Sequence, residues 1–345
     1  METTAVEKKY KSVLDIRTTE QAIQQTKDFF AGQLAEKLQL SRVSAPMVVL
    51  KGTGINDDLN GYERAVAFPI KDMQEQKAEV VHSLAKWKRL RLQELGIEEG
   101  KGLYTNMYAL RPDEDLSPIH SIFVDQWDWE KHIYVAQRSI PFLQETVEKI
   151  YEAIKATEAK LHELYPVLSP VLPDKISFIQ AEDLLKQYPK LSPKERENEA
   201  AKKYGAVFII GIGGALKGGE PHDGRAPDYD DWTTETEPGY KGLNGDIILW
   251  NPVLKRAFEV SSMGIRVDKI ALLRQLEIAG CLDRKELFFH SKLLKGEIPQ
   301  SIGGGIGQSR LCMFLLKKAH IGEVQVSIWP DALKEECREK GIELL

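Results

Sequence analysis

Apolar side chains recur three, four or seven positions apart in two long stretches of the chain. The first stretch runs from Thr18 to Leu40 and begins with a Thr18-x-x-Gln21 pattern, which is typical of a helix-capping box. The second runs from about Phe142 to Leu164. The apolar positions are Ile23, Phe30, Leu34 and Leu38 in the first, and Leu143, Val147, Ile150, Ile154, Leu161 and Leu164 in the second. Both stretches predict amphipathic helices that pack on a core.

Strand-like segments account for much of the remaining pattern, and several of them alternate apolar with polar residues. They span residues 78–84, 103–111, 120–130, 206–214, 245–251 and 257–267, and a short apolar run, "MVVL", follows Pro46. Only eight residues separate Arg111 from His120, too few for a parallel crossover, so the flanking strands should form a hairpin. The predicted fold is α+β, an antiparallel β-sheet flanked by helices, in a single domain over residues 1–345.

Composition narrows the class of protein without identifying it. Charged residues make up 29% of the 345 positions and the formal net charge is −5, which gives no general attraction to nucleic acid. No apolar run reaches the roughly 18 residues of a membrane helix, and the first residues do not resemble a secretory signal. We therefore expect a cytoplasmic protein whose three cysteines are reduced thiols.

A glycine-rich segment, "SIGGGIGQSRL" at residues 301–311, resembles a phosphate-binding loop at first sight. It lacks the lysine of a Walker loop, and its GxGxGxxR spacing follows a helix-like stretch rather than the strand that a dinucleotide fingerprint requires. A third possibility is a glycine segment whose backbone a ligand can approach closely and which leads into a helix carrying Arg310. A nucleotide could then contact both the guanidinium and the helix N-terminus. The alternative is a glycine bend that serves tight packing.

Polar residues occupy single faces of the predicted strands. Period-2 spacing puts Gln126, Asp128 and Glu130 on one face, opposite Trp127 and Trp129. Arg111, at the end of the partner strand, is followed by three acids at positions 113–115. The arginine and the acids either belong to a functional site or form a salt-bridged turn at the surface.

A later strand shows the same design. Glu259 and Ser261 should share a face opposite Phe258 and Val260, and Asp246 lies on the preceding strand. Such an acid pair could hold Mg²⁺ between the protein and phosphate oxygens, unless the two acids lie at separate strand ends. The basic stretch 82–93 could be a nucleic-acid patch, but a solvated helix face is the commoner explanation.

Together these patterns resemble the class II aminoacyl-tRNA synthetase core, and "RPDED" with "DQWDWE" resembles its aspartyl and asparaginyl branch. The whole chain is most similar to the ammonia-dependent asparagine synthetase (aspartate-ammonia ligase) family. The similarity lies in "VVHSLAKWKR", "GLYTNMYALRPDED", "VDQWDWE", "RAPDYDDW", "GLNGDI", "SSMGIR" and "GGGIGQSR". It implies a class II synthetase-like catalytic domain that makes asparagine, AMP and pyrophosphate from aspartate, ATP and ammonia through a β-aspartyl adenylate.

The resemblance also implies roles for single residues. Arg111 and Arg310 match catalytic arginines that contact ATP phosphates, and Asp246 and Glu259 match residues that hold Mg²⁺ beside ATP. Residues matched to aspartate binding are Ser83, Lys88, Gln126, Asp128, Asp57, Ser262 and Arg266; Lys88 is also a catalytic candidate. Ser261, Gly305 and Gly307 match ATP-binding positions. Asp57 or Asp230 could accept a proton from ammonium, because free ammonia is the attacking species.

The same resemblance implies a homodimer formed through residues from about Thr18 to Leu50, and no nucleic-acid or membrane partner. Glu2 stands where a glutamine-dependent enzyme with an N-terminal nucleophile would need cysteine, so ammonia should be the direct donor. Two alternatives are a tRNA-charging enzyme and a catalytically dead sensor. A sensor would be expected to lose a motif arginine or a metal-binding acid.

Overall fold

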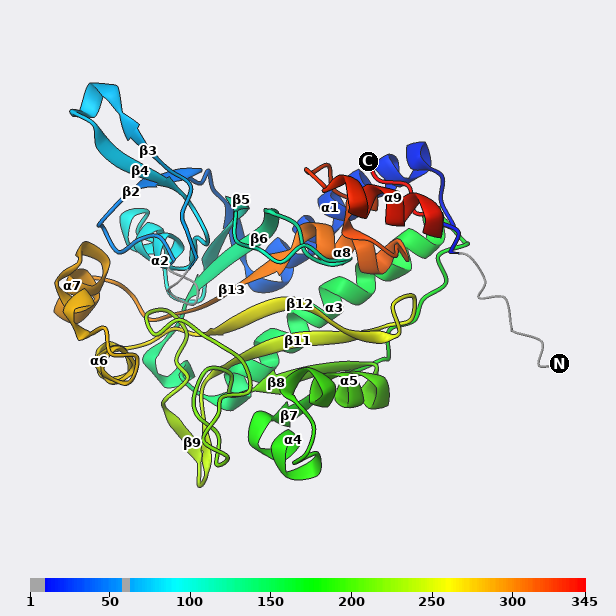
Figure 1. The fold of residues 1–345 in the computed structure, drawn as a ribbon. Coiled ribbons are helices and arrows are strands. Elements are labelled where there is room, and N and C mark those ends of the chain that lie inside the picture. Colours follow the sequence, from blue (N-terminus) through cyan, green and yellow to red (C-terminus); the bar gives the residue numbers. More distant parts are fainter. Residues whose placement is uncertain (1–9, 58–62) are drawn as a thin grey trace.

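An eight-stranded sheet forms the centre of the computed structural model, which describes residues 10–57 and 63–345 (Figure 1). In spatial order its strands are β1 (Leu40–Arg42), β5 (Gly102–Leu110), β6 (Phe123–His132), β13 (Ser301–Gly307), β12 (Arg256–Ile265), β11 (Asn244–Asn251), β8 (Ala206–Ile210) and β7 (Ser177–Gln180). The edge pairs β1–β5 and β7–β8 are parallel, and the pairs between them are antiparallel. The α+β fold and the β5–β6 hairpin are therefore confirmed, while Glu2 lies outside the described residues.

One face of the sheet is covered by helices that bury the main core. They are the two long helices α1 (Ile16–Leu38) and α3 (Ile140–Leu164) and the short helix α8 (Gln308–Leu315), and α9 (Asp331–Lys340) follows later in the chain (Figure 1). Helix α1 begins one turn earlier than predicted, because the side chain of Asp15, rather than that of Thr18, caps it by accepting from the Thr18 N–H. The apolar stripe of α3 is buried as predicted except Leu164, which is the last residue of the helix and is exposed.

The other face carries shorter helices and leaves the middle of the sheet uncovered by helix. Helix α2 (Ala85–Glu94) packs against β6 and β13, and α5 (Pro193–Tyr204) packs with α4 (Ala181–Gln187) over β8, β11 and β12. Helices α6 (Lys269–Ile278) and α7 (Phe288–Lys295) form a small core with α2. Between α2 and α5, polar side chains of the central strands face a cavity.

The prediction that the basic stretch 82–93 forms a solvated helix face is wrong. Lys86, Lys88 and Arg89 of α2 are all buried, and Arg91 is half-buried. Each buried cation has an acceptor, because Lys86 reaches Asp228 and Arg89 donates to backbone carbonyl groups. Helix α2 is therefore fixed by charges that point into the molecule, and they do not form a nucleic-acid patch.

Several predicted strands are shorter than expected. The segment 78–84 contributes only the end of β4 (Gln76–Val80), since the chain then turns into α2. Strand β4 lies between β2 (Val48–Leu50) and β3 (Ala67–Ile70) in a small sheet that projects from the body (Figure 1). A further two-stranded hairpin is formed by β9 (Glu235–Glu237) and β10 (Tyr240–Lys241). Strand β8 ends at Ile210 because Gly211 and Gly213 take positive φ values.

Within the described residues, none of the helices combines the length and the apolar content needed to cross a membrane.

Candidate active site

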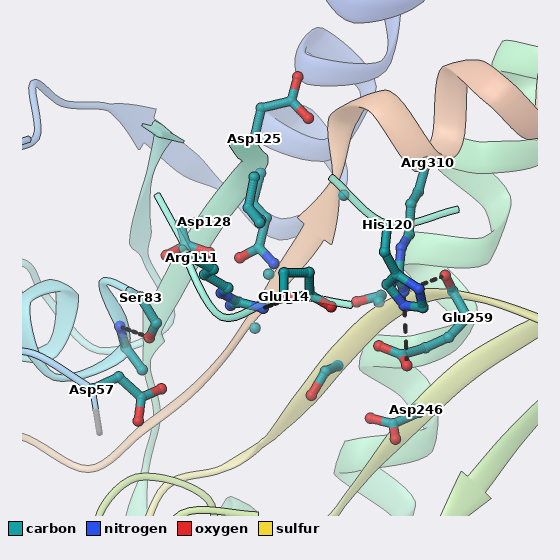
Figure 2. A pocket seen from close by; sticks show the side chains of 18 of the residues that line it. Asp57, Ser83, Arg111, Glu114, His120, Asp125, Asp128, Asp246, Glu259 and Arg310 are labelled. Atoms are coloured by element: carbon teal, nitrogen blue, oxygen red, sulfur yellow. Dashed lines mark hydrogen bonds and ion pairs between the residues drawn. The ribbon is translucent and has the colours of Figure 1, made fainter. Parts of the chain in front are cut away.

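A cavity of about 570 Å³ opens over the middle of the sheet, and every candidate residue from the sequence borders it. Asp57 and Ser83 lie at one end, while Asp246, Glu259 and Arg310 lie at the other (Figure 2). The remaining candidates in the lining are Lys88, Arg111, Gln126, Asp128, Asp230, Ser261, Ser262, Arg266, Gly305 and Gly307. Residues from more than 250 positions of sequence therefore meet in one cavity.

The glycine-rich segment is a strand rather than a loop. Residues 301–307 form β13 between β6 and β12, and none of its glycines has a positive φ. A Cβ atom on Gly305 would lie 2.4 Å from Gln126 Oε1 and 2.7 Å from Asp128 Oδ1. One on Gly303 would lie 2.0 Å from Glu130 Oε2. These glycines therefore make room for polar side chains of β6, of which Gln126 and Asp128 border the cavity and Glu130 is fully buried. The strand leads directly into α8, the helix that the sequence predicted there.

Lys88 and Asp128 form a buried pair at the Ser83 end of the pocket. Lys88 Nζ lies 3.3 Å from Asp128 Oδ2 and donates to the Gly304 carbonyl at 2.9 Å. The Leu84 N–H also donates to Asp128. Burial lowers the pKa of Lys88, and the charge of Asp128 only partly opposes this shift. The pair leaves one carboxylate oxygen and one ammonium hydrogen for a small polar ligand.

Arg266 joins two buried acids behind this pair. It contacts Glu130 through Nε at 3.0 Å and Nη2 at 2.8 Å, and it also donates to Asp230. Burial would raise the pKa of Glu130, but the positive charge of Arg266 has the larger effect and the pKa is lowered. Burial would lower the pKa of Arg266, but the charges of Glu130 and Asp230 have the larger effect and the pKa is raised. The guanidinium is thus committed to protein partners and supports the pocket wall from behind.

Sequence reasoning missed Arg225, which lies in the irregular segment before β9. Its Nη2 is 2.7 Å from Asp246 Oδ1, its Nη1 donates to Ser262 Oγ, and its Nε is 3.5 Å from Asp230 Oδ2. The one sequence feature that could have identified Arg225 is its place in the block "RAPDYDDW", in which only Asp230 was predicted as a site residue. His120, Lys194 and Asp223 also border the cavity and were likewise missed.

Asp246 and Glu259 are close enough to influence each other. Burial raises the pKa of Asp246 to about 6, and the charge of Glu259 adds to this while Arg225 opposes it. Two hard carboxylates that repel each other beside an open cavity suit Mg²⁺, which commonly takes one or two protein carboxylates together with substrate phosphates. Among the described residues no group of three or more His, Cys, Asp or Glu is arranged as a complete metal cage. The residues therefore fit a metal brought in with a phosphate ligand.

A bulge in β12 corrects the predicted face for Ser261. Ile247 pairs with Ser261 and Ile248 with Glu259, so Val260 is an extra residue in the strand. Ser261 is opposite Ile306 and Ile247, both in the main core, whereas Ser262 is opposite Gly305 and Asp246 on the pocket side. Ser261 still borders the cavity, but Ser262 is the serine that shares the face of Glu259.

The end of the pocket with Arg310 is more open. Arg310 is 3.8 Å from Glu259 there. Arg111 lies nearer Asp128 (Figure 2), where it donates to the His82 carbonyl and is 3.9 Å from Glu114. The side chains of both arginines are about a quarter exposed. His120 lies beside Arg310 (Figure 2), and burial together with that positive charge lowers its pKa to about 4. Asp113, the first acid after Arg111, pairs with Arg64 instead. Arg111 and Arg310 therefore keep donors available for an anionic ligand.

Comparison with known proteins agrees with this geometry. A sequence model of the family described as aspartate-ammonia ligase matches residues 17–341. An aspartate-ammonia ligase of Parabacteroides distasonis is 59% identical over 97% of both chains, and one of Clostridium perfringens strain 13 is 54% identical over 100% of both.

Solved structures show the same fold at much lower identity. An asparaginyl-tRNA synthetase of Entamoeba histolytica in complex with asparaginyl-adenylate superposes with a TM-score of 0.64 at 13% identity, over 90% of this chain and 66% of that one. The asparaginyl-tRNA synthetase of Pyrococcus horikoshii complexed with asparaginyl-adenylate gives 0.61 at 16% identity, over 91% and 71%. The fold is thus that of a class II aminoacyl-tRNA synthetase catalytic core, and the chain belongs to the aspartate-ammonia ligase family.

Proposed function

We propose that this pocket converts L-aspartate, ATP and ammonia into L-asparagine, AMP and pyrophosphate through a β-aspartyl adenylate. Family membership supports ATP-dependent asparagine synthesis. The observation that carries the detail is the division of one cavity into a buried end with paired charges, beside which Arg111 lies, and a second end with Arg310 and two acids (Figure 2). The first suits a small amino acid with charges of both signs, and the second suits a metal-bound triphosphate.

Aspartate binds at the Lys88 end. The buried carboxylate of Asp128 is the partner for the substrate ammonium group, and Gln126 and Ser83 offer neutral hydrogen bonds beside it. Lys88 supplies a positive charge for a substrate carboxylate while it remains bound to the Gly304 carbonyl. Because these groups already hold one another in place, the substrate replaces solvent in a site that needs little rearrangement.

ATP binds toward the Arg310 end, with Gly305 and Gly307 allowing close approach to the strand. Arg111 and Arg310 place guanidinium groups where negative charge spreads as the aspartate side-chain carboxylate attacks the α-phosphorus. Asp246 and Glu259 would hold Mg²⁺, which supplies charge neutralisation for the phosphate oxygens. Arg225 would have to share or release Asp246 when the metal binds.

Ammonia then attacks the activated carbonyl carbon and AMP leaves. Ammonium predominates at neutral pH, so a base must take its proton, and Asp57 and Asp230 remain the two candidates. Both are buried at the pocket wall, and Asp230 already faces Arg266 and Arg225. Replacing each by Asn and measuring asparagine formation against pH tests the idea, and an unchanged profile in both variants would remove it.

The deciding experiment uses purified protein with aspartate and Mg-ATP, with and without ammonium or tRNA. Mass spectrometry should detect asparagine and AMP in equal amounts only when ammonium is present, and independently of tRNA. Formation of aspartyl-tRNA would establish the charging alternative, and ligand binding without product would establish the sensor.

The assembly and location of the enzyme are part of the same proposal. Helix α1 and the strands after it would form a homodimer, consistent with the exposed apolar side chains of Met47 and Val48; a monomeric mass in light scattering at micromolar concentration would contradict this. The substrates are cytoplasmic metabolites, so we place the enzyme in the cytoplasm, which cell fractionation can check.

A further inference from the structure

A second cavity, of about 560 Å³, adjoins the active-site pocket. Asp57 and Glu63 border both cavities. The rest of the lining comes mainly from β2 and the turn after it, α2, the irregular segment before β9, and α7. Asp57 lies at the end of the pocket away from Arg310 (Figure 2). The two cavities therefore meet at the end that we assign to aspartate.

His82 borders this second cavity and carries a buried hydrogen-bond acceptor. Its Nδ1 lies 3.0 Å from the backbone carbonyl oxygen of Asp57. A carbonyl oxygen can only accept, so Nδ1 carries a proton, and Nε2 is an acceptor when the ring is neutral. His82 is 2% exposed, and Nε2 has no hydrogen-bond partner among residues 10–57 and 63–345.

His290 and Asp228 present two more acceptors. Asp228 Oδ2 accepts from Lys86 Nζ and from His290 Nε2, each at 2.9 Å. Burial alone would raise the pKa of Asp228, but Lys86 and His290 lower it well below its usual range, so the carboxylate is ionised. His290 Nε2 therefore carries a proton, and Nδ1 is an acceptor when the ring is neutral. Within the described part of the chain, neither that atom nor Asp228 Oδ1 has a partner.

The residues around the cavity thus have three buried acceptors without a donor in the described part of the chain. A buried acceptor that lacks a donor is unfavourable, so a ligand that supplies donors is favoured. The complementary ligand has N–H or O–H donors and needs few or no acceptors, and ammonium, with four donors and no acceptor, fits that description.

The charge around the cavity also favours a cation. The carboxylates of Asp57, Asp228 and Glu79 are all largely buried, whereas the side chains of Lys51 and Arg64 are 59% and 78% exposed at the rim. Lys86 is the one cation in the lining with a fully buried side chain among the described residues, and Asp228 already binds it. Arg284, 22% exposed, also lies near Asp228.

We propose that this second cavity is a separate entrance for ammonium, which is held by His82 Nε2, His290 Nδ1 and Asp228 Oδ1 before it passes Asp57 into the pocket. The proposal rests on the proposed function, because it concerns the second substrate of that reaction. A separate entrance lets ammonium arrive while ATP and aspartate fill the main pocket.

Two substitutions remove an acceptor and keep the neighbouring hydrogen bond. In His290→Gln the side-chain amide can still donate to Asp228 but the Nδ1 acceptor is gone. In His82→Asn the amide can still donate to the Asp57 carbonyl but the Nε2 acceptor is gone. His320→Asn is the matched control, because His320 is also buried, its Nε2 is also unpaired, its Nδ1 accepts from Gly322, and it borders neither cavity.

Steady-state rates of asparagine formation against ammonium chloride provide the test. Both cavity variants should raise the KM for ammonium about tenfold, leave the KM values for aspartate and ATP within twofold, and leave aspartate-dependent ATP–pyrophosphate exchange unchanged. Hydroxylamine, which is largely uncharged just above neutral pH, should be used equally well by the variants and the natural enzyme. His320→Asn should change none of these values.

Other outcomes separate the two ideas. If the natural enzyme shows no aspartate-dependent exchange, the proposed function fails. If exchange is intact but the KM for ammonium stays within twofold in both variants, or all KM values rise together, the entrance is wrong. If neither variant folds, crystals of the natural protein soaked in rubidium chloride decide: an anomalous peak in the second cavity supports the cation site, and its absence overturns it.

Discussion

Arg266 and Glu130, behind the end of the pocket that we assign to aspartate, form a buried and short ion pair. Arg310 and Glu259, at the end assigned to ATP, form a longer and partly exposed pair, although Arg225 holds Asp246 in a buried pair at that end as well. Arg266 and Glu130 are 2.8 Å apart with side chains at most 2% exposed, while Arg310 and Glu259 are 3.8 Å apart and 24% and 34% exposed. The cost of removing charge from water is met during folding at the first end. For Arg310 and Glu259 much of that cost is met only when the ligand binds, so a large charged substrate and its products can exchange there.

The largest expected effect comes from breaking the buried end. Arg266→Ala leaves Glu130 and Asp230 buried without their partner, and should lower the free energy of unfolding by about 3–5 kcal/mol. Arg310→Ala, at the open end, should lower it by less than about 1 kcal/mol. Urea unfolding of both variants measures the difference, and equal losses would show that the two ends do not differ as described.

The next largest effect is on activity, and here we expect the end assigned to ATP to be the more sensitive of the two. Arg310→Ala should lower kcat/KM for ATP about 100-fold to 1000-fold, because a charge-stabilising donor is lost where phosphate charge develops. Stability should be nearly unchanged, in contrast to Arg266→Ala. ATP–pyrophosphate exchange gives the rate, and Arg338→Ala, an exposed arginine of α9, is the control. A loss below tenfold would remove Arg310 from the phosphate site.

The smallest effect depends on pH at the open end. The pKa of Asp246 is raised from 3.8 to about 6, so between these values the folded protein takes up a proton that the unfolded chain lacks. The stability contribution of this group therefore falls as the pH rises through that window. Metal binding needs the ionised form, so the KM for Mg-ATP should be about threefold to fivefold higher at pH 5.5 than at pH 7.5.

A variant sharpens this last comparison. Asp223 adds negative charge near Asp246, so Asp223→Asn should move the rise in KM to lower pH. Asp174→Asn, a fully exposed acid away from the pocket, should leave the profile unchanged. A KM for Mg-ATP that stays constant from pH 5.5 to 7.5 in the natural enzyme would show that Asp246 does not bind the metal as a titrating ligand.

Features that depend on local periodicity, such as the buried and polar faces of single strands, could be predicted from the sequence. Alternation along β6 correctly separated Gln126 and Asp128 from Trp127 and Trp129, because the face of a regular strand follows from residue number alone. The class of fold was also predicted, from strand spacing and from the family resemblance. The family resemblance predicted in addition that the motif residues meet in one site.

What could not be predicted depends on pairing between distant segments. The bulge that turns Ser261 to the core arises from the register of β11 against β12, which the sequence of one strand does not contain. Lys86 and Lys88 resembled a solvated face because their buried partners, Asp228 and Asp128, lie 142 and 40 positions away along the chain. The glycines of β13 have little strand propensity, and their reason for being glycine lies in the side chains of β6.

The bulge at Val260 has a consequence for how this site can change during evolution. On one side of it Glu259 faces the pocket at an odd position, and on the other Ser262 faces it at an even one. Loss of a single codon there would restore strict alternation and turn one half of the strand over. Either the carboxylate of Glu259 or the hydroxyl of Ser262 would then point into the hydrophobic core. Substitutions can tune this strand one side chain at a time, but insertions and deletions act on a whole half of the site at once. Lineages that keep the reaction should therefore hold the length of this segment constant even where its residues vary.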